Sequence, residues 1–115
     1  MTRSTVFCTV HLEGIHRWET CPIEEVKYLR DDHRHIFIVK AYVPVTHSDR
    51  DVEFIWLKHQ IQNYMRTMYW SQEYNCHYFD KRSCEMIAEE LIREFGLSMC
   101  EVSEDGENGA IVEVD

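Results

Sequence analysis

The segment from Ser83 to Gly96 restricts the fold most, because it has the features of a complete amphipathic helix. Ser83 is a favoured N-cap residue, and Gly96 suits the left-handed position that follows a helix C-terminus. The apolar side chains between them recur at helical spacing on one face: Ile87, Ala88, Leu91, Ile92 and Phe95. We therefore expect a helix over this segment, with one face in the core.

Two upstream segments, residues 4–12 and 34–46, are rich in β-branched and aromatic residues. This composition is typical of strands. Pro44 has no amide hydrogen, so it must lie at an edge, a bulge or the end of the second strand. Residues 19–32 have no strong periodicity, and we expect them to form a loop over the sheet.

The sequence HSDRDVEF at residues 47–54 predicts the start of another helix, capped by Ser48 or Asp49. Acidic residues in this stretch favour the positive end of the helix dipole. The predicted core face has apolar residues three and four apart: Phe54, Leu57, Ile61, Tyr64, Met65 and Met68.

The C-terminal part predicts a strand at residues 99–102, a turn containing Gly106 and Gly109, and a strand at residues 110–114. The expected order is strand, strand, helix, helix, strand, strand. A chain of 115 residues with 44% hydrophobic residues can bury one core and is too short for two. We therefore expect one α+β domain over residues 1–115.

The net charge of -9 argues against binding to nucleic acid or to an anionic membrane surface. A small molecule or a protein is the expected partner. No apolar run is long enough to span a membrane, and residues 1–14 lack the pattern of a signal peptide. We expect a soluble cytoplasmic protein.

The five cysteines are odd in number and have no C-x-x-C spacing, which argues against a disulfide framework or a cysteine zinc site. We expect mostly free thiols. They are Cys8, Cys21, Cys76, Cys84 and Cys100.

Three histidines form a candidate metal site. His33 and His35 are two residues apart in a strand pattern, so both side chains leave the same face of the sheet. His16 becomes the natural third ligand if the first two strands pair as a hairpin. Three imidazoles leave a fourth position open, as in catalytic zinc sites. By itself, H-x-H in a strand also fits partly exposed, hydrogen-bonded histidines.

Five segments add a second line of argument because they resemble, in order, the motifs of one family. They are EGIHRW at 13–18, HRHIFIV at 33–39, VEFIWLK at 52–58, SCEMIAEEL at 83–91 and SEDGENGA at 103–110. The family is that of the 6-pyruvoyl-tetrahydropterin and 6-carboxy-tetrahydropterin synthases. Its pattern runs F-x-A-A-H-R, H-G-H, D-F-x-x-L-K, T-S-E and a late E-T.

This resemblance implies zinc held by His16, His33 and His35. It also implies a tunnelling-fold type unit, in which an antiparallel four-stranded sheet carries two helices on one face. Such units form homo-oligomers, here a trimer or hexamer, whose sheets close a barrel with active sites between subunits. The late glutamate that anchors the pterin ring falls on Glu104, with Glu107 as a competing assignment.

The chain departs from the family at the proton-transfer residues. The family has a cysteine shortly before H-G-H, and the only upstream candidate here is Cys21. The family's L-D-H-x-x-L-N motif has no clear counterpart, although His77 and Asp80 lie a little downstream. These three residues are the candidate catalytic groups. Arg34 replaces the glycine of H-G-H, and we expect its side chain on the opposite face, solvated or paired with an acid.

The resemblance implies a zinc-dependent lyase acting on a substrate like dihydroneopterin triphosphate. The missing relay leaves two alternatives open. One is a zinc-containing protein that binds a pterin or purine without catalysis. The other is an enzyme of deazapurine synthesis that acts on a different heterocycle.

Overall fold

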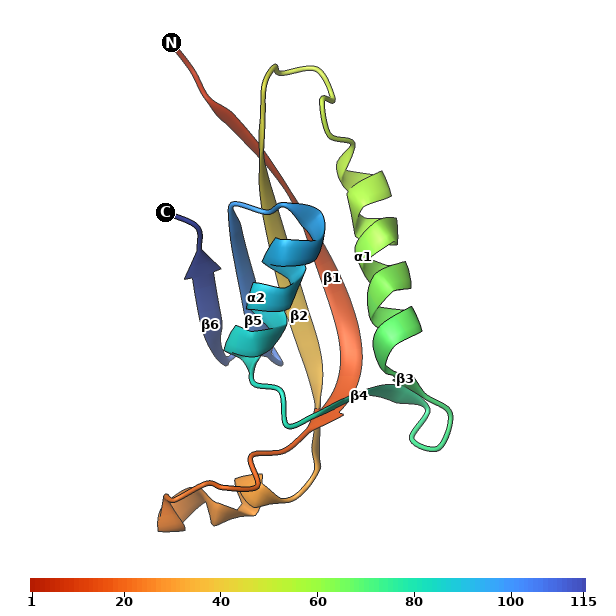
Figure 1. The fold of residues 1–115 in the computed structure, drawn as a ribbon, viewed down its shortest axis with the longest axis vertical. Coiled ribbons are helices and arrows are strands. Elements are labelled where there is room, and N and C mark those ends of the chain that lie inside the picture. The colour runs from red at the N-terminus through yellow and green to blue at the C-terminus, as the bar shows by residue number, and fades with distance from the viewer.

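Two long strands, β1 (Ser4–His16) and β2 (His33–Val45), lie at the centre of the sheet in the computed structural model, which describes residues 1–115 (Figure 1). They pair antiparallel along their whole length, from Ser4 opposite Val45 to His16 opposite His33. The antiparallel pairing that His16 needs in order to be the third ligand is therefore present. β1 is longer than expected, so His16 lies within it rather than beyond its end, and β2 begins and ends one residue earlier than expected.

The sheet has six strands in the order β3-β4-β1-β2-β5-β6, so the expected four-stranded ββααββ unit is wrong. The additional strands are β3 (Trp70–Ser71) and β4 (Cys76–Asp80), which lie between the two long helices in the chain. β4 pairs parallel with the end of β1, whereas all other pairs are antiparallel. The sheet is open and mixed, with β5 (Met99–Glu104) and β6 (Asn108–Glu113) at its other end.

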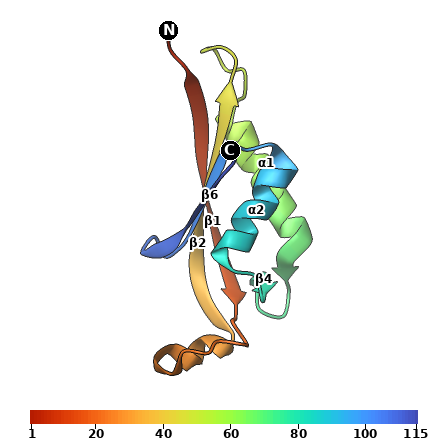
Figure 2. The same ribbon diagram turned by 60° about the vertical axis from the view of Figure 1, so that its left-hand side comes forward.

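Both long helices, α1 (Phe54–Tyr69) and α2 (Cys84–Phe95), lie on the same face of the sheet, as Figure 2 shows. α2 has the predicted bounds. The Ser83 hydroxyl accepts a hydrogen bond from the amide of Met86, and Gly96 has a φ of 62°. The cap of α1 differs from the prediction, because the Glu53 side chain accepts from the amide of Trp56. Thr46 binds Asp51 upstream, so the segment before Glu53 remains a loop.

The core face of α1 is narrower than predicted. Its buried residues lie four apart along one row: Leu57, Ile61, Met65 and Tyr69. Such a row is inclined to the helix axis. The side of α1 that packs on the sheet therefore shifts gradually around the helix from its start to its end. Phe54, at the start of α1, and Met68, near its end, each point about a quarter-turn away from this row, because successive residues are rotated by about 100°. Both are consequently exposed.

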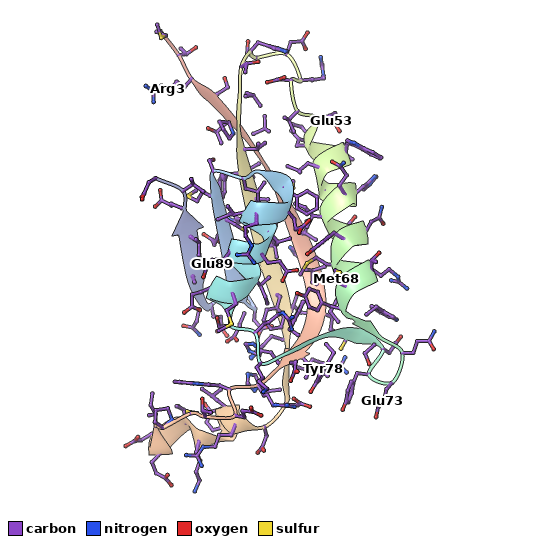
Figure 3. All side chains as sticks on the ribbon, in the orientation of Figure 1. Arg3, Glu53, Met68, Glu73, Tyr78 and Glu89 are labelled. Carbon is purple, nitrogen blue, oxygen red and sulfur yellow. The ribbon has the colours of Figure 1, made fainter.

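Side chains from α1, α2 and the covered face of the sheet fill the space between the two layers (Figure 3). Phe37 and Val39 of β2, Phe79 of β4 and Leu91 of α2 are fully buried in this core. The opposite face of the sheet carries no helix (Figure 2). The core thus fixes the positions of β1, β2 and β5, whose ends build the site described below.

The connection between β1 and β2 contains a 3-10 helix, η1 (Glu24–Arg30), so the predicted loop over the sheet is wrong. It extends beyond the end of the sheet (Figure 1). The two ends of this connection are joined by a hydrogen bond from the amide of Trp18 to the carbonyl of Leu29, at 2.7 Å. Neither this segment nor either long helix is long and apolar enough to cross a membrane.

Candidate metal centre

Three histidine side chains meet where β1 ends and β2 begins. His16 and His33 face each other in the antiparallel register, and their ring centroids lie 4.6 Å apart. His35 follows two residues later on the same face of β2, with its ring 5.2 Å from that of His33. The two-residue period of the strand and the register of the hairpin together gather the three predicted ligands.

Each histidine uses its Nδ1 atom for a hydrogen bond outside the group. The acceptor is the carbonyl oxygen of Arg82 for His16, at 2.8 Å, and the carbonyl oxygen of Asp31 for His33, at 2.8 Å. Such bonds place the hydrogen on Nδ1 and leave the Nε2 lone pair available. This is the arrangement that orients metal-binding histidines.

His35 is fixed in the same way by a side chain, since its Nδ1 atom lies 2.7 Å from Oδ2 of Asp105. The other oxygen of Asp105 accepts from the amide of Ile36, at 2.9 Å, and the Asp105 amide donates to the Ile36 carbonyl. Asp105 has a φ of 59°, which allows its chain to turn back against β2. The hydrogen bond from the Ile36 amide is the main cause that lowers the pKa of the Asp105 carboxyl, and the contact with His35 adds to the effect.

The fourth member of the cluster is Glu104, the last residue of β5. Its Oε2 atom lies 2.6 Å from Nε2 of His16, and its Oε1 atom lies 3.7 Å from Nε2 of His35. The four side chains His16, His33, His35 and Glu104 each offer one ligand atom, and these atoms all lie within 4.8 Å of one another. They could hold a metal ion.

The contact between His16 and Glu104 is chemically incomplete without a positive species. The Nε2 atom of His16 is buried, and no hydrogen bond of normal donor geometry satisfies it, despite its short distance to the carboxylate. Because Nδ1 already carries a hydrogen, a proton or a metal cation has to lie between Nε2 and Oε2. Burial lowers the pKa of His16, but the Glu104 carboxylate and the Arg82 carbonyl outweigh it and raise the pKa overall. The close contact with His16 in turn lowers the pKa of the Glu104 carboxyl.

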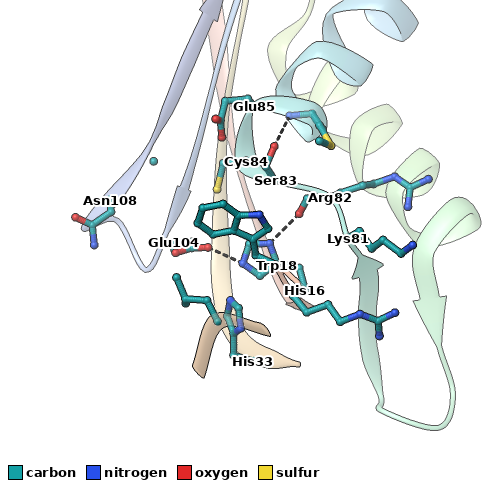
Figure 4. Close-up of a pocket in the computed structure, with 14 residues that line it drawn as sticks. His16, Trp18, His33, Lys81, Arg82, Ser83, Cys84, Glu85, Glu104 and Asn108 are labelled. Carbon is teal, nitrogen blue, oxygen red and sulfur yellow. Dashed lines mark hydrogen bonds and ion pairs between the residues drawn. The ribbon is translucent and has the colours of Figure 1, made fainter. Parts of the chain in front are cut away.

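A cavity of about 400 Å³ opens beside the cluster (Figure 4). Its size lies within the range of small-molecule sites. His16, His33 and Glu104 form one wall, while the half-exposed indole of Trp18 and the start of α2 form others. The cluster and the cavity are therefore parts of one site.

Two of the predicted site residues lie elsewhere. Cys21 is buried in the loop after β1, where its Sγ atom faces the carbonyls of Ile23 and Val26, both at 3.8 Å. It lines neither the cluster nor the cavity. Glu107 is exposed in the turn between β5 and β6 and also lies outside the cluster. Of the two glutamates, only Glu104 borders the cavity.

His77 and Asp80 both lie on β4 but belong to separate environments. The Nδ1 atom of His77 bonds the carbonyl of Glu13 at 2.9 Å, and its ring packs against Phe79. Burial lowers the pKa of His77. The buried Oδ1 atom of Asp80 has one charged partner, Nη2 of Arg17 at 3.0 Å. Neither residue lines the cavity that holds the cluster.

Arg34 lies on the face of β2 opposite the histidine ligands, as expected. Its guanidinium donates to Oε1 of Glu13 at 3.1 Å and to the carbonyl of Tyr74 at 3.0 Å. The prediction of a pairing with a neighbouring acid is confirmed. Arg34 thus joins the β1 end to the turn before β4.

Sequence reasoning missed several residues that shape the site. Asp31, Arg82 and Asp105 orient the ligands, two of them through backbone carbonyls that leave no side-chain signature. Cys84, at the start of α2, lines the cavity, and its burial raises the pKa of its thiol to about 12. Of these residues, only Asp105 was visible in the sequence as a candidate, because carboxylates commonly orient histidine ligands.

No protein-family model matches the chain, and no curated protein matches it significantly. The resemblance to the tetrahydropterin synthases therefore rests on the five ordered motifs. The geometry of the four-residue cluster is independent of that resemblance.

Proposed function

We propose that this protein is a zinc-dependent enzyme acting on a reduced pterin, similar to the 6-pyruvoyl- and 6-carboxy-tetrahydropterin synthases. The observation that carries the proposal is the cluster of His16, His33, His35 and Glu104, whose ligand atoms lie within 4.8 Å of one another. The hydrogen bonds at Nδ1 of all three histidines support it, because they present the Nε2 atoms as ligands.

Zinc fits this set of side chains. Imidazole nitrogens and one carboxylate oxygen are ligands that zinc accepts in tetrahedral sites. The buried Nε2 atom of His16 lies 2.6 Å from a carboxylate oxygen and has no hydrogen-bond partner, which gives a further reason to place a cation there. We prefer zinc over iron because of the donor types together with the family resemblance.

Bound zinc would polarise side-chain oxygens of the substrate and acidify the adjacent C–H bonds. The chain's own residues would position the substrate. Glu104 borders the cavity and can accept two neighbouring N–H groups of a pterin ring. The Trp18 indole supplies a flat apolar surface at the same cavity.

The second candidate is a zinc-containing protein that binds a pterin or purine without catalysing the family reaction. A specific observation favours it: none of the predicted proton-transfer residues Cys21, His77 and Asp80 lines the cavity. The thiol that does line it, Cys84, has a pKa of about 12 and is a poor base at neutral pH. The third hypothesis is a diverged enzyme of deazapurine synthesis that acts on another heterocycle.

The proposal includes a homo-oligomer, a trimer or hexamer, in which open sheets join into a barrel. Two unpaired strand edges support it. β4 pairs with β1 only from Gly14 onward, which leaves the β1 edge over residues 4–13 without a neighbouring strand. β6 leaves the opposite edge of the sheet open. Open edges of this length favour pairing with another chain. Light scattering on the purified protein measures the mass of the assembly.

The test combines metal analysis with turnover. The protein is purified, its zinc content is measured, and dihydroneopterin triphosphate is supplied with product detection by mass spectrometry. Zinc and turnover together support the leading function. Stoichiometric zinc without turnover favours the binding protein, and mass spectrometry of a co-purified ligand then identifies the heterocycle. The absence of any metal binding contradicts the proposal.

A further inference from the structure

Glu104 differs from the other three members of the cluster in how it is held. Each histidine has a hydrogen bond to an acceptor outside the cluster, but the polar contacts of the Glu104 carboxylate are with His16 and His35 alone. No backbone amide and no hydroxyl donates to it. Its side chain is about one-quarter exposed and borders the cavity. Glu104 is thus the one group of the cluster with freedom to change its partner.

The backbone of Glu104 is fixed even though its carboxylate is not. Glu104 lies opposite Phe37 in the β2–β5 register, and the Asp105 amide bonds the Ile36 carbonyl directly after it. A change of partner therefore needs only a rotation of the Glu104 side chain. The strand that carries it can stay in place.

The two oxygens of Glu104 are already directed to histidine Nε2 atoms, at 2.6 Å for His16 and 3.7 Å for His35. A carboxylate that completes a metal site cannot simultaneously accept a pair of N–H groups from a ring in the cavity. The two roles exclude each other. A four-ligand zinc site is also closed, whereas a reacting one needs an open position.

We propose that Glu104 is an exchangeable fourth ligand of the metal, an inference that rests on the proposed metal function. In the free protein it closes the metal site, and a heterocycle with adjacent N–H donors draws it away and opens that position. Substrate binding and metal exposure are then coupled. Thermodynamic linkage makes the coupling reciprocal, so the metal weakens ring binding by the same factor as the ring weakens metal binding.

The first arm of the test replaces zinc with Co²⁺, whose visible absorption reports coordination number and ligand type. Wild type should bind Co²⁺ in a site that azide does not enter. Glu104→Gln should bind Co²⁺ more weakly, by at least the roughly 10- to 100-fold that loss of an outer-shell partner costs, and should admit azide. Glu101→Gln removes the same charge from the same strand but lies outside the cluster, so it should match wild type.

The second arm measures binding of unsubstituted pterin, which has the ring donors but no side-chain oxygens to reach the metal. Pterin should bind metal-free wild type more tightly than the Co²⁺-loaded protein. In Glu104→Gln, pterin binding should be weak and independent of Co²⁺. Thermal unfolding of each metal-free variant checks that the fold is retained.

The outcomes separate this inference from the proposed function. An unchanged Co²⁺ spectrum and affinity in Glu104→Gln overturns ligation by Glu104 and leaves the histidine site standing. Entry of azide into the wild-type site also overturns it. Pterin that fails to bind metal-free wild type, or binds it no more tightly than the loaded protein, overturns the exchange. If wild type binds no Co²⁺, the proposed metal function itself fails.

Discussion

The Nδ1 atom of His35 lies 2.7 Å from Oδ2 of Asp105, a residue seventy positions further along the chain. This contact joins the start of β2 to the end of β5. It fixes which nitrogen of His35 carries the hydrogen, and thereby directs Nε2 toward His16 and Glu104.

Asp105→Asn should weaken zinc binding by roughly 10- to 100-fold. The asparagine can keep the left-handed backbone and accept the Ile36 amide, but its NH₂ group then faces Nδ1 of His35. The His35 hydrogen moves to Nε2, where it blocks the lone pair. Calorimetric titration with Zn²⁺ measures the loss. Asp49→Asn, in an exposed loop, removes the same charge and should leave the affinity unchanged.

Gly14→Ala should destabilise the fold by about 1–3 kcal/mol, as overpacking of a well-packed core does. A Cβ atom there would lie 2.5 Å from Cε2 of Phe79 and 3.1 Å from Cδ2 of Phe37. Both rings are fully buried and have no room to withdraw. Urea unfolding measures the change, and Thr9→Ala on the same strand serves as control. Equal midpoints for Gly14→Ala and wild type would contradict this packing.

Stability should fall as the pH rises from about 10 to about 12. The hydroxyls of Tyr64 and Tyr69 both donate to the Glu90 carboxylate between α1 and α2. Burial, followed by Glu90, raises the pKa of Tyr69 from 10 to about 12. Below pH 10 the tyrosines keep their protons in both the folded and the unfolded chain, and their hydrogen bonds contribute fully to stability. Above pH 10 the tyrosines of the unfolded chain ionise first, which favours unfolding.

Urea unfolding at increasing pH measures this loss. The double variant Tyr64→Phe and Tyr69→Phe should show a shallower decline over the same interval. A decline as steep as that of wild type would assign the loss to other groups.

The thiol of Cys84 should resist alkylation at pH 8 although it lines the cavity. All five cysteines are buried, and burial raises the pKa of Cys84 to about 12, so almost no thiolate is present. Iodoacetamide labelling followed by mass spectrometry should detect modification only after denaturation. Rapid labelling of Cys84 in the folded protein would show that the cavity holds a thiolate.

Local patterns predicted the parts of the fold that local interactions determine. α2 was found from Ser83 and Gly96 because cap residues act within one turn of the helix. His33 and His35 were placed on one face because a strand repeats every two residues. His16 needed only the hairpin assumption, and the register then brought it opposite His33.

The missed features depend on contacts distant in sequence. β3 has two residues and β4 five, too few for a clear alternation, and β4 forms by parallel pairing with β1. The bond from His16 to Arg82 uses a backbone carbonyl, which every residue has. Glu104 was predicted as a ring anchor, and only the β2–β5 register shows that it also reaches the histidines.

The zinc content of the purified protein and of two histidine variants tests the metal centre most directly. After dialysis, wild type should retain stoichiometric zinc, and so should His11→Ala, whose exposed side chain lies on β1 outside the cluster. His33→Ala should lose most of the metal, because it removes one of the three histidine ligands. Zinc in His33→Ala equal to that in wild type would contradict a metal centre built on the three histidines.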